Sequence, residues 1–245
     1  FSVPGVTSMS MDFHKYAYAP KGASVIVYRV RALRRHQIYA CAAWTGYTVV
    51  NTTVQSTKSG GPLAAPWALL RAVGDAGYLD LARRTLAATR TIVAALREIP
   101  GLRVLGEPEM SLVAFTADAG GPPIFPLADA MKARGWLVQP QFGGLGSPAN
   151  LHLTISAGHL AVADRFVADL RAAVDEIRGA APDPALAALL QVAGSLDFSN
   201  MSEESLVQAL AMAGIRGGGL PERMATINAL LDALPAPARE AAIIA

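Results

Sequence analysis

The segment from Ser8 to Gly22 places a histidine and a lysine side by side, His14 and Lys15, ahead of a β-branched run. Burial of a lysine beside a cationic or aromatic group lowers its pKa and leaves a nucleophilic amine that forms imines. Pyridoxal 5'-phosphate is the cofactor held by such a lysine as a Schiff base. Its phosphate needs donors, and His14, Lys21 and nearby backbone amides are suitable ones. Residue types alone also fit an ordinary solvated loop, because a lysine beside a histidine is common.

The order of residues around Lys15 is more specific than their composition. The run reads Asp12-x-His14-Lys15-Tyr16-x-Tyr18-Ala19-Pro20-Lys21-Gly22 over eleven positions. It resembles the cofactor-lysine segment of the sphingosine-1-phosphate lyases, members of the group II pyridoxal-phosphate-dependent decarboxylase family. Shorter similarities continue in register as far as residue 180: Trp44-Thr45-Gly46, Ser56-Thr57-Lys58-Ser59-Gly60-Gly61, Gly74-x-x-Gly77-Tyr78, Gly101-Leu102-x-Val104-x-Gly106-x-Pro108, Gly135-Trp136, His152 and His159.

The resemblance implies roles for the residues of the lysine segment. Lys15 matches the catalytic lysine that binds the cofactor, and His14 matches a contact to the cofactor phosphate. Lys21 matches the lysine of a Pro-Lys-Gly turn that helps to hold the substrate phosphate. Tyr16 and Tyr18 match two tyrosines of the lysine loop, and their roles stay open.

A second turn is implied to contact phosphate across a homodimer interface. Thr57 and Gly60 match its cofactor-binding positions, and Lys58 matches a position that serves the substrate phosphate. Lys58 stands where the family usually has arginine, and Ser59 where it has proline. An ammonium does not reproduce the planar, bidentate geometry of a guanidinium, so specificity for the phosphate end of the substrate stays open. Ala43 also departs from the family, which commonly has an acidic residue before the tryptophan.

The implied activity is that of a pyridoxal-phosphate-dependent lyase, classed as an aldehyde-lyase. Its substrate would be a phosphorylated amine such as a sphingoid base phosphate, cleaved to an aldehyde and phosphoethanolamine in sphingolipid metabolism. The first alternative is an amino-acid decarboxylase, a carboxy-lyase of the same superfamily. It shares the lysine but needs a carboxylate site, and Lys21 together with the Ser-Thr-Lys turn favours the lyase.

The second alternative is a non-catalytic remnant. In this family the aspartate that pairs the pyridine nitrogen, the ring-stacking residue and part of the phosphate cup precede the lysine. Only fourteen residues precede Lys15 here, so the chain is expected to be a carboxyl-terminal fragment whose activity requires the missing amino-terminal part.

Composition and charge narrow the remaining classes. The chain has 245 residues, of which 52% are hydrophobic and 16% charged, so we expect a folded protein. With 21 basic and 19 acidic residues it lacks the charge excess of a nucleic-acid binder. Cys41 is a lone thiol, which excludes a disulfide framework or a cysteine-rich metal site. Mean hydropathy is +0.33, yet the apolar stretches are too short to span a membrane, and a cytoplasmic, bacterial protein is expected.

The expected fold class is α/β: the carboxyl-terminal part of a fold-type I, aspartate aminotransferase-like enzyme. Residues 1–78 are assigned to the end of the large, cofactor-binding domain, 79–180 to a small α+β domain, and 181–245 to a linker and helical tail. His159 is expected to cap the helix that follows it. Hydrophobic periodicity and turn residues predict strands over 24–30, 102–105, 111–116, 136–139 and 151–156, and helices over 62–76, 79–98, 126–134, 161–177, 185–194, 202–213 and 221–234.

Overall fold

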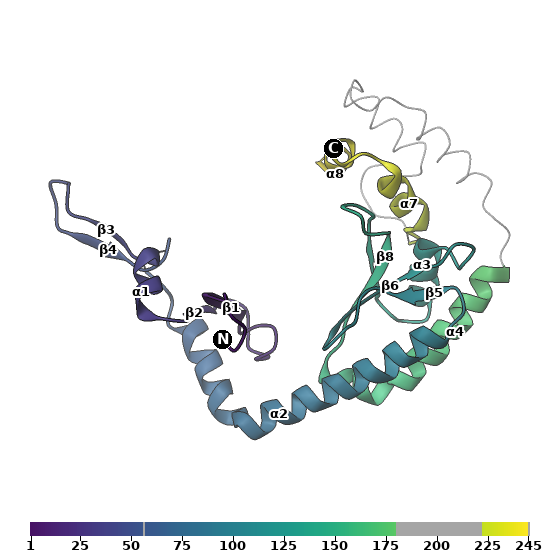
Figure 1. Cartoon of the computed structure of the whole chain (residues 1–245), viewed down its shortest axis with the longest axis horizontal. Coiled ribbons are helices and arrows are strands. Elements are labelled where there is room, and N and C mark those ends of the chain that lie inside the picture. The colour runs from purple at the N-terminus through teal and green to yellow at the C-terminus, as the bar shows by residue number, and fades with distance from the viewer. Residues whose placement is uncertain (56, 180–221, 245) are drawn as a thin grey trace. The chain divides into compact units, whose positions relative to one another are not determined.

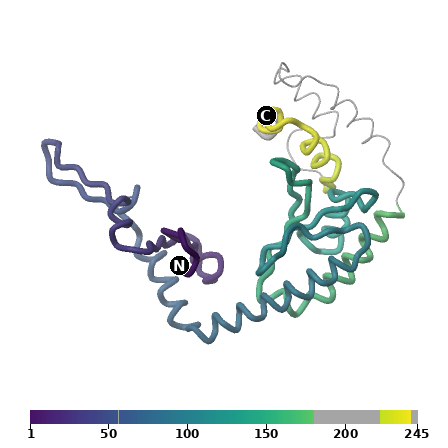
Figure 2. Tube along the Cα trace, in the orientation of Figure 1, coloured from purple at the N-terminus to yellow at the C-terminus, as the bar shows by residue number. Residues whose placement is uncertain are grey.

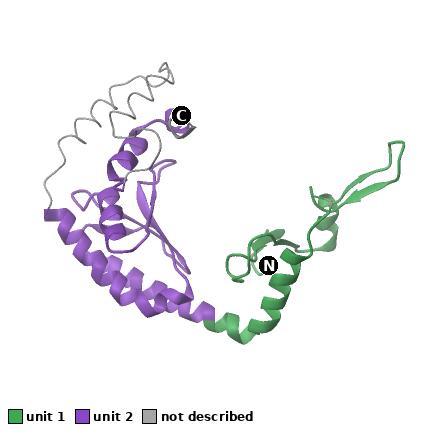
Figure 3. Cartoon of the chain, turned by 180° about the vertical axis from the view of Figure 1, so that it is seen from behind, with its two compact units in different colours: residues 1–80 green, residues 81–245 purple. Residues whose placement is uncertain are grey.

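The computed structural model of the chain describes residues 1–55, 57–179 and 222–244 (Figure 1). These residues form two compact units, Phe1–Asp80 and Leu81–Ala245 (Figure 3). Within the described residues, no helix has both the length and the apolar character needed to cross a membrane. The predicted helices at 185–194 and 202–213, the predicted linker and Ser56 lie outside the described residues.

Unit 1 is built from two antiparallel strand pairs and the start of a long helix. Its elements before that helix are β1 (Ser8–Asp12), β2 (Ser24–Tyr28), α1 (Arg31–Arg34), the 3-10 turn η1 (Arg35–Gln37), β3 (Tyr39–Cys41) and β4 (Val49–Asn51). β1 pairs with β2, with Asp12 opposite Ser24, and β3 pairs with β4. The strand predicted at residues 24–30 is confirmed as β2. The loop between β1 and β2 carries Lys15, so this hairpin positions the segment with the most specific motif.

The helix α2 (Gly61–Glu98) contains both helices predicted for this region. Gly74 interrupts it with φ 62° and ψ 176°, a left-handed φ that glycine adopts without steric cost. The break predicted between the helices at 62–76 and 79–98 is therefore present as a kink at Gly74 rather than as a loop. Beyond the kink, the hydroxyls of Thr85 and Thr89 donate to carbonyls four residues earlier, so these buried polar groups are satisfied within the helix.

Unit 2 has a four-stranded antiparallel sheet in the order β5-β6-β8-β7. Its strands are β5 (Leu102–Val104), β6 (Leu112–Ala117), β7 (Gln139–Gln141) and β8 (Asn150–Thr154). The helices that follow or join them are α3 (Ile124–Ala133), the 3-10 turn η2 (Ala157–Val162), α4 (Ala163–Gly179), α7 (Ala225–Ala233) and α8 (Ala236–Ile244). Figure 2 traces this path from the sheet to the carboxyl-terminal helices.

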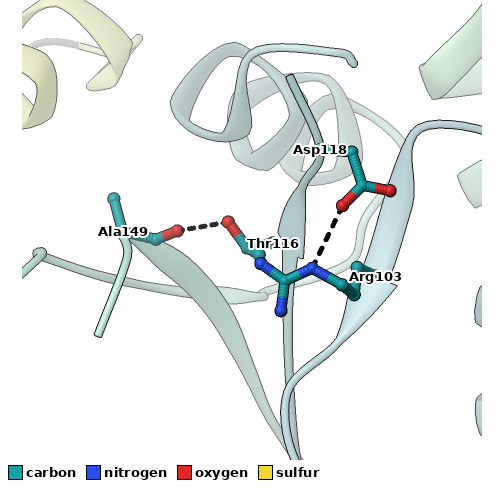
Figure 4. A network of polar contacts seen from close by, with 4 residues as sticks. All are labelled: Arg103, Thr116, Asp118 and Ala149. Carbon is teal, nitrogen blue, oxygen red and sulfur yellow. Dashed lines mark hydrogen bonds and ion pairs between the residues drawn. The ribbon is translucent and has the colours of Figure 1, made fainter. Parts of the chain in front are cut away.

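The core of unit 2 lies between the sheet, the second part of α2, α3 and α4. Its fully buried large side chains are Phe115, Leu96, Leu127, Met131, Leu151 and Leu170. Burial of that many apolar side chains is the main favourable contribution to folding. Polar contacts fix the strand ends: Arg103 pairs with Asp118 at 3.0 Å, and the Thr116 hydroxyl donates to the Ala149 carbonyl at 2.7 Å (Figure 4).

Several boundaries in unit 2 differ from the sequence prediction, and two of the differences have a local physical reason. The strand predicted at 136–139 begins only at Gln139, because Gly135 (φ 85°) closes α3 and the Trp136 amide donates back to the Met131 carbonyl. The helix predicted from Pro126 begins at Ile124, because a proline in the first helical turn removes an amide that has no partner there. His159 has a capping role, but at η2, the turn in which it lies, and not at the helix that follows: its Nδ1 accepts the Ser156 amide at 2.8 Å in a capping box.

Candidate active site

The lysine loop is a compact series of turns. Lys15 donates its amide to the Asp12 carbonyl, Tyr18 to the Lys15 carbonyl, and Ala19 to the Phe13 carbonyl, at 2.9 to 3.1 Å. Tyr18 has φ 58°, a left-handed conformation that is costly for a bulky residue and needs support from its surroundings. The Tyr78 hydroxyl supplies part of that support by donating to the Ala17 carbonyl at 3.0 Å. The loop is therefore held to α2 as well as to β1 and β2.

The structure corrects one expectation for Lys15. Its side chain is 63% exposed rather than buried, and its Nζ lies 2.8 Å from Asp12 Oδ2. The hydrogen bond and the attraction to Asp12 raise the pKa of Lys15 instead of lowering it. The same hydrogen bond, with a second from the Ser24 hydroxyl, lowers the pKa of Asp12. Among the described residues, then, Lys15 is held as an ammonium by a carboxylate three residues earlier.

His14 carries a buried atom that lacks a partner. The residue is half-buried, and its Nδ1 has no hydrogen-bond partner among the described residues. Buried polar atoms are almost always satisfied, so an orphaned ring nitrogen beside the predicted cofactor lysine indicates a partner outside these residues. This observation fits the role that the sequence predicts for His14 as a contact to a cofactor phosphate.

The Pro-Lys-Gly turn lies against the beginning of α2. Gly22 has φ 121°, and a Cβ at this position would lie 2.9 Å from the Cβ of Pro62. Both the backbone conformation and the close approach therefore require glycine here. Pro62 directly follows Gly61, so the structure brings the turn of Lys21 close to the end of the Thr57–Gly61 turn. Lys21 itself is exposed.

The Thr57–Gly61 turn leads directly into α2. The Gly60 carbonyl accepts the amides of Leu63 and Ala64 at 3.1 and 2.9 Å, which begins the helix. Thr57, Lys58 and Gly60 are exposed, and Lys58 Nζ donates to the Thr53 hydroxyl at 2.9 Å. The amine of Lys58 is thus directed to its own loop. The amides at a helix amino terminus attract anions, so this turn has the local geometry of a phosphate site.

The sequence prediction did not include Asp12 or Tyr78 among the site residues. Asp12 sets the charge state of Lys15, and Tyr78 fixes the backbone of the same loop. The three-residue spacing of Asp12 and Lys15 was a usable signal for the ion pair. Tyr78 is sixty-one residues from its partner, so local spacing gives no signal for it. Tyr16 and Tyr18 are 58% and 46% exposed, and their roles stay open.

Comparison with known proteins finds similarity to enzymes of one kind. The sphingosine-1-phosphate lyase of Arabidopsis thaliana is 37% identical over 210 residues, which cover 84% of this chain and 37% of the plant protein. The Saccharomyces cerevisiae sphingosine-1-phosphate lyase is 34% identical over 212 residues, covering 84% of this chain and 35% of the yeast protein. The solved structure of the Burkholderia pseudomallei sphingosine-1-phosphate lyase matches with a TM-score of 0.64 and 40% identity, over 77% of this chain and 41% of that one. This chain is a homologue of the sphingosine-1-phosphate lyases.

The other comparisons concern the fold and the carboxyl-terminal part of this homologue. Its fold is that of fold-type I pyridoxal-phosphate enzymes, as expected from the sequence. The glutamate decarboxylase of Lactobacillus brevis has the same fold, with a TM-score of 0.60 at 18% identity. Residues 168–245 match the family described as "Pyridoxal-dependent enzyme, C-terminal putative HTH domain". The chain spans just over a third of the length of the curated lyases, 37% and 35% for the plant and yeast proteins.

Proposed function

We propose that this chain is the cofactor-lysine part of a pyridoxal 5'-phosphate-dependent carbon–carbon lyase. The substrate is a phosphorylated long-chain amine, and the products are an aldehyde and phosphoethanolamine. The observation that carries the proposal is the eleven-residue lysine segment, which forms a loop fixed by β1, β2 and Tyr78. Similarity at 34–40% identity to proteins named sphingosine-1-phosphate lyase supports the same substrate class.

The residues of unit 1 fit the cofactor in their chemistry. Lys15 offers an accessible amine, and His14 offers a buried ring nitrogen without a partner among the described residues. When bound, pyridoxal phosphate supplies an electron sink for the bond that breaks beside the amine carbon. Lys15 would hold the cofactor covalently, and His14 would orient its phosphate.

The ion pair of Lys15 and Asp12 sets the first requirement on this chemistry. An ammonium is not a nucleophile, so Lys15 must transfer its proton before its amine can react. The Lys15 side chain is 63% exposed and that of Asp12 32%, and ion pairs that solvent reaches in this way are weak. Asp12 therefore holds the lysine protonated in the resting loop, and because the pKa of Asp12 is itself lowered, the proton must leave Lys15 to water or to another base.

The substrate phosphate is assigned to Lys21 and Lys58. Their turns approach each other at Gly22 and Pro62, and the amino terminus of α2 adds favourably oriented amides. Lysines attract a phosphate as point charges without the fixed fork of arginine. We expect such a site to tolerate variation in phosphate position better than an arginine site.

We further propose that the active protein is a homodimer. The Thr57–Gly61 turn is exposed, as a turn that serves a neighbouring active site would be. The β3–β4 hairpin beside it exposes large apolar side chains, including Tyr39, Tyr47 and Val50, which are suited to a subunit interface. Light scattering of the cofactor-loaded full-length protein should give the mass of a dimer, and a fully loaded monomer would contradict this.

The function is tested with the full-length protein and its cofactor. A sphingoid base phosphate should yield a long-chain aldehyde and phosphoethanolamine, both measured by mass spectrometry. The unphosphorylated base serves as the substrate control, and a panel of amino acids with detection of carbon dioxide tests the decarboxylase alternative. Release of carbon dioxide without cleavage of the phosphorylated base would replace the lyase by a decarboxylase. Inactivity on both, with no cofactor bound, would leave the non-catalytic alternative.

A further inference from the structure

The carboxyl-terminal helices α7 and α8 are docked within unit 2. α7 lies beside α3 (Figures 1 and 2). The side chains of these helices and of the turn between them that are buried in the contact are Ile227, Leu230, Leu234 and Ala238. Asp129 on α3 accepts the Met224 and Ala225 amides at 3.0 and 2.9 Å. A carboxylate at these amides satisfies the amino terminus of α7 and complements its dipole.

The carboxyl-terminal end of α7 contacts the loop from Phe142 to Ala149, which also belongs to unit 2. Asp232 Oδ1 accepts the Gly143 amide at 2.6 Å. Asp232 lies in the last turn of α7, where a negative charge interacts unfavourably with the helix dipole. Its carboxylate therefore does not stabilise the helix, and its hydrogen bond to the Gly143 amide of the loop accounts for its position. The Arg239 guanidinium lies 4.8 Å from the centre of the Phe142 ring and donates to the Leu231 carbonyl at 2.7 Å.

The held loop contains a strained turn. Gly144 and Ser147 exchange two backbone hydrogen bonds of 3.0 and 2.9 Å around Leu145 and Gly146. Leu145 is fully exposed with φ 49°, in a position where asparagine or glycine is the ordinary choice. Backbone strain of this kind persists only where the surrounding structure fixes it. The contacts from Asp232 and Arg239 are made at the base of this turn.

The charge of the segment argues against a nucleic-acid-binding role. Residues 168–245 match a family described as a putative HTH domain, yet they contain ten acidic side chains and five basic ones. Three of the basic side chains are already engaged in unit 2: Arg171 with Glu98, Arg178 with the Pro100 carbonyl, and Arg239 as described above. Affinity for nucleic acids depends on neutralising phosphates, which this segment is not equipped to do.

We propose that α7 and α8 act as an intramolecular brace that positions the Phe142–Ala149 loop, and that they do not read nucleic acid. Asp232 and Arg239 are the positioning residues, and Asp129 fixes the helix from which they act. The brace belongs to unit 2 alone and does not depend on the function proposed for unit 1.

Hydrogen–deuterium exchange of the full chain tests the brace. In Asp232→Ala, peptides that cover residues 142–149 should exchange at least about tenfold faster. The wild-type loop must break the hydrogen bond from Gly143 to Asp232 when it opens, whereas the loop of the variant opens without that cost. The matched control is Asp175→Ala, which removes an exposed carboxylate from α4 and should leave these peptides unchanged. Unchanged exchange in folded Asp232→Ala would overturn the proposal.

Two further measurements keep the test decisive. Arg239→Lys keeps the charge but loses the planar donor geometry, so it should accelerate exchange of the same peptides even if Asp232→Ala does not fold. A fluorescently labelled random-sequence duplex DNA is then titrated with the wild-type chain at low salt, and its anisotropy should stay constant. A saturable rise that disappears as salt is added would show nucleic-acid binding and refute the proposed role.

Discussion

The two units differ in how much apolar surface they bury. Unit 1 carries every residue that the sequence predicts for the cofactor and the phosphates, yet its buried residues, among those described, are only Ala19, Ala23 and Pro66. Unit 2 buries Phe115, Leu127 and many other large apolar side chains but carries none of the predicted site residues. Local turns and single hydrogen bonds hold the predicted site residues of unit 1, whereas a packed apolar core holds unit 2 together.

This difference shows what each kind of structure can hold. A core fixes its members collectively, so each of them contributes to stability. The Lys15 loop relies instead on the Tyr78 hydroxyl, on Gly22 at its close approach to Pro62, and on one accessible ion pair. Each of these contacts involves only one or two residues, so the loss of one of them should alter the loop without unfolding unit 2. The four predictions below test this contrast.

The largest effect is expected for Lys15→Ala in the full-length, cofactor-loaded protein. Removal of the amine should abolish covalent attachment of the cofactor and lower turnover by at least about a thousandfold. Borohydride reduction followed by peptide mass spectrometry should find the cofactor on the wild-type peptide that contains Lys15 and not on the variant. Lys132→Ala, in unit 2, is the control and should keep both. Cofactor found on another lysine of an active enzyme would refute the assignment.

The next effect concerns stability and should appear only in unit 2. Phe115 is fully buried, and Phe115→Ala should lower the free energy of unfolding by about 3–5 kcal/mol. Tyr47 is 79% exposed, so Tyr47→Ala should change it by no more than about 0.5 kcal/mol. Urea unfolding of the chain followed by circular dichroism provides both values. Similar losses for the two variants would show that unit 1 contains a core that its burial does not reveal.

A smaller effect is expected at the substrate phosphate. Lys21→Ala in the full-length protein should weaken phosphorylated substrates by about ten- to a hundredfold and leave cofactor affinity nearly unchanged. Lys21→Arg keeps the charge and should recover most of the loss. The comparison of kcat/KM for phosphorylated and unphosphorylated amines is the measurement. Equal losses for the two substrates would remove Lys21 from the phosphate site.

The same contrast explains what sequence reasoning could predict. Periodicity and glycine positions located α3, α4, α7 and most strands of unit 2, because packing there follows a regular apolar pattern, but they did not predict α8. The motif around Lys15 predicted the similarity to sphingosine-1-phosphate lyases that the comparisons found, because it combines particular residues at fixed spacing. The exposure of Lys15 and the docking of α7 on Asp129 were not predictable, since both depend on which residues distant in sequence come together.

The smallest effect is a pH dependence of the resting loop. Asp12 has a lowered pKa, so its part of the pairing is present above its ordinary value near 3.8 and is lost as pH falls through the lower, folded value. Lys15 has a raised pKa, so its part is present below its ordinary value near 10.5 and is lost only as pH rises through the higher, folded value.

In Asp12→Asn, which removes the main cause of the shift, the pKa of Lys15 should fall toward its ordinary value. Reductive methylation of the chain at a series of pH values, read by mass spectrometry at Lys15, should therefore begin at lower pH in the variant. Ser24→Ala is the matched control, because it removes the other hydrogen bond to Asp12 while the carboxylate that faces Lys15 remains, and it should leave the Lys15 profile close to that of the wild type. Identical profiles for Asp12→Asn and the wild type would mean that the ion pair does not govern the lysine in solution, and that its amine is as available in the isolated chain as any other exposed lysine.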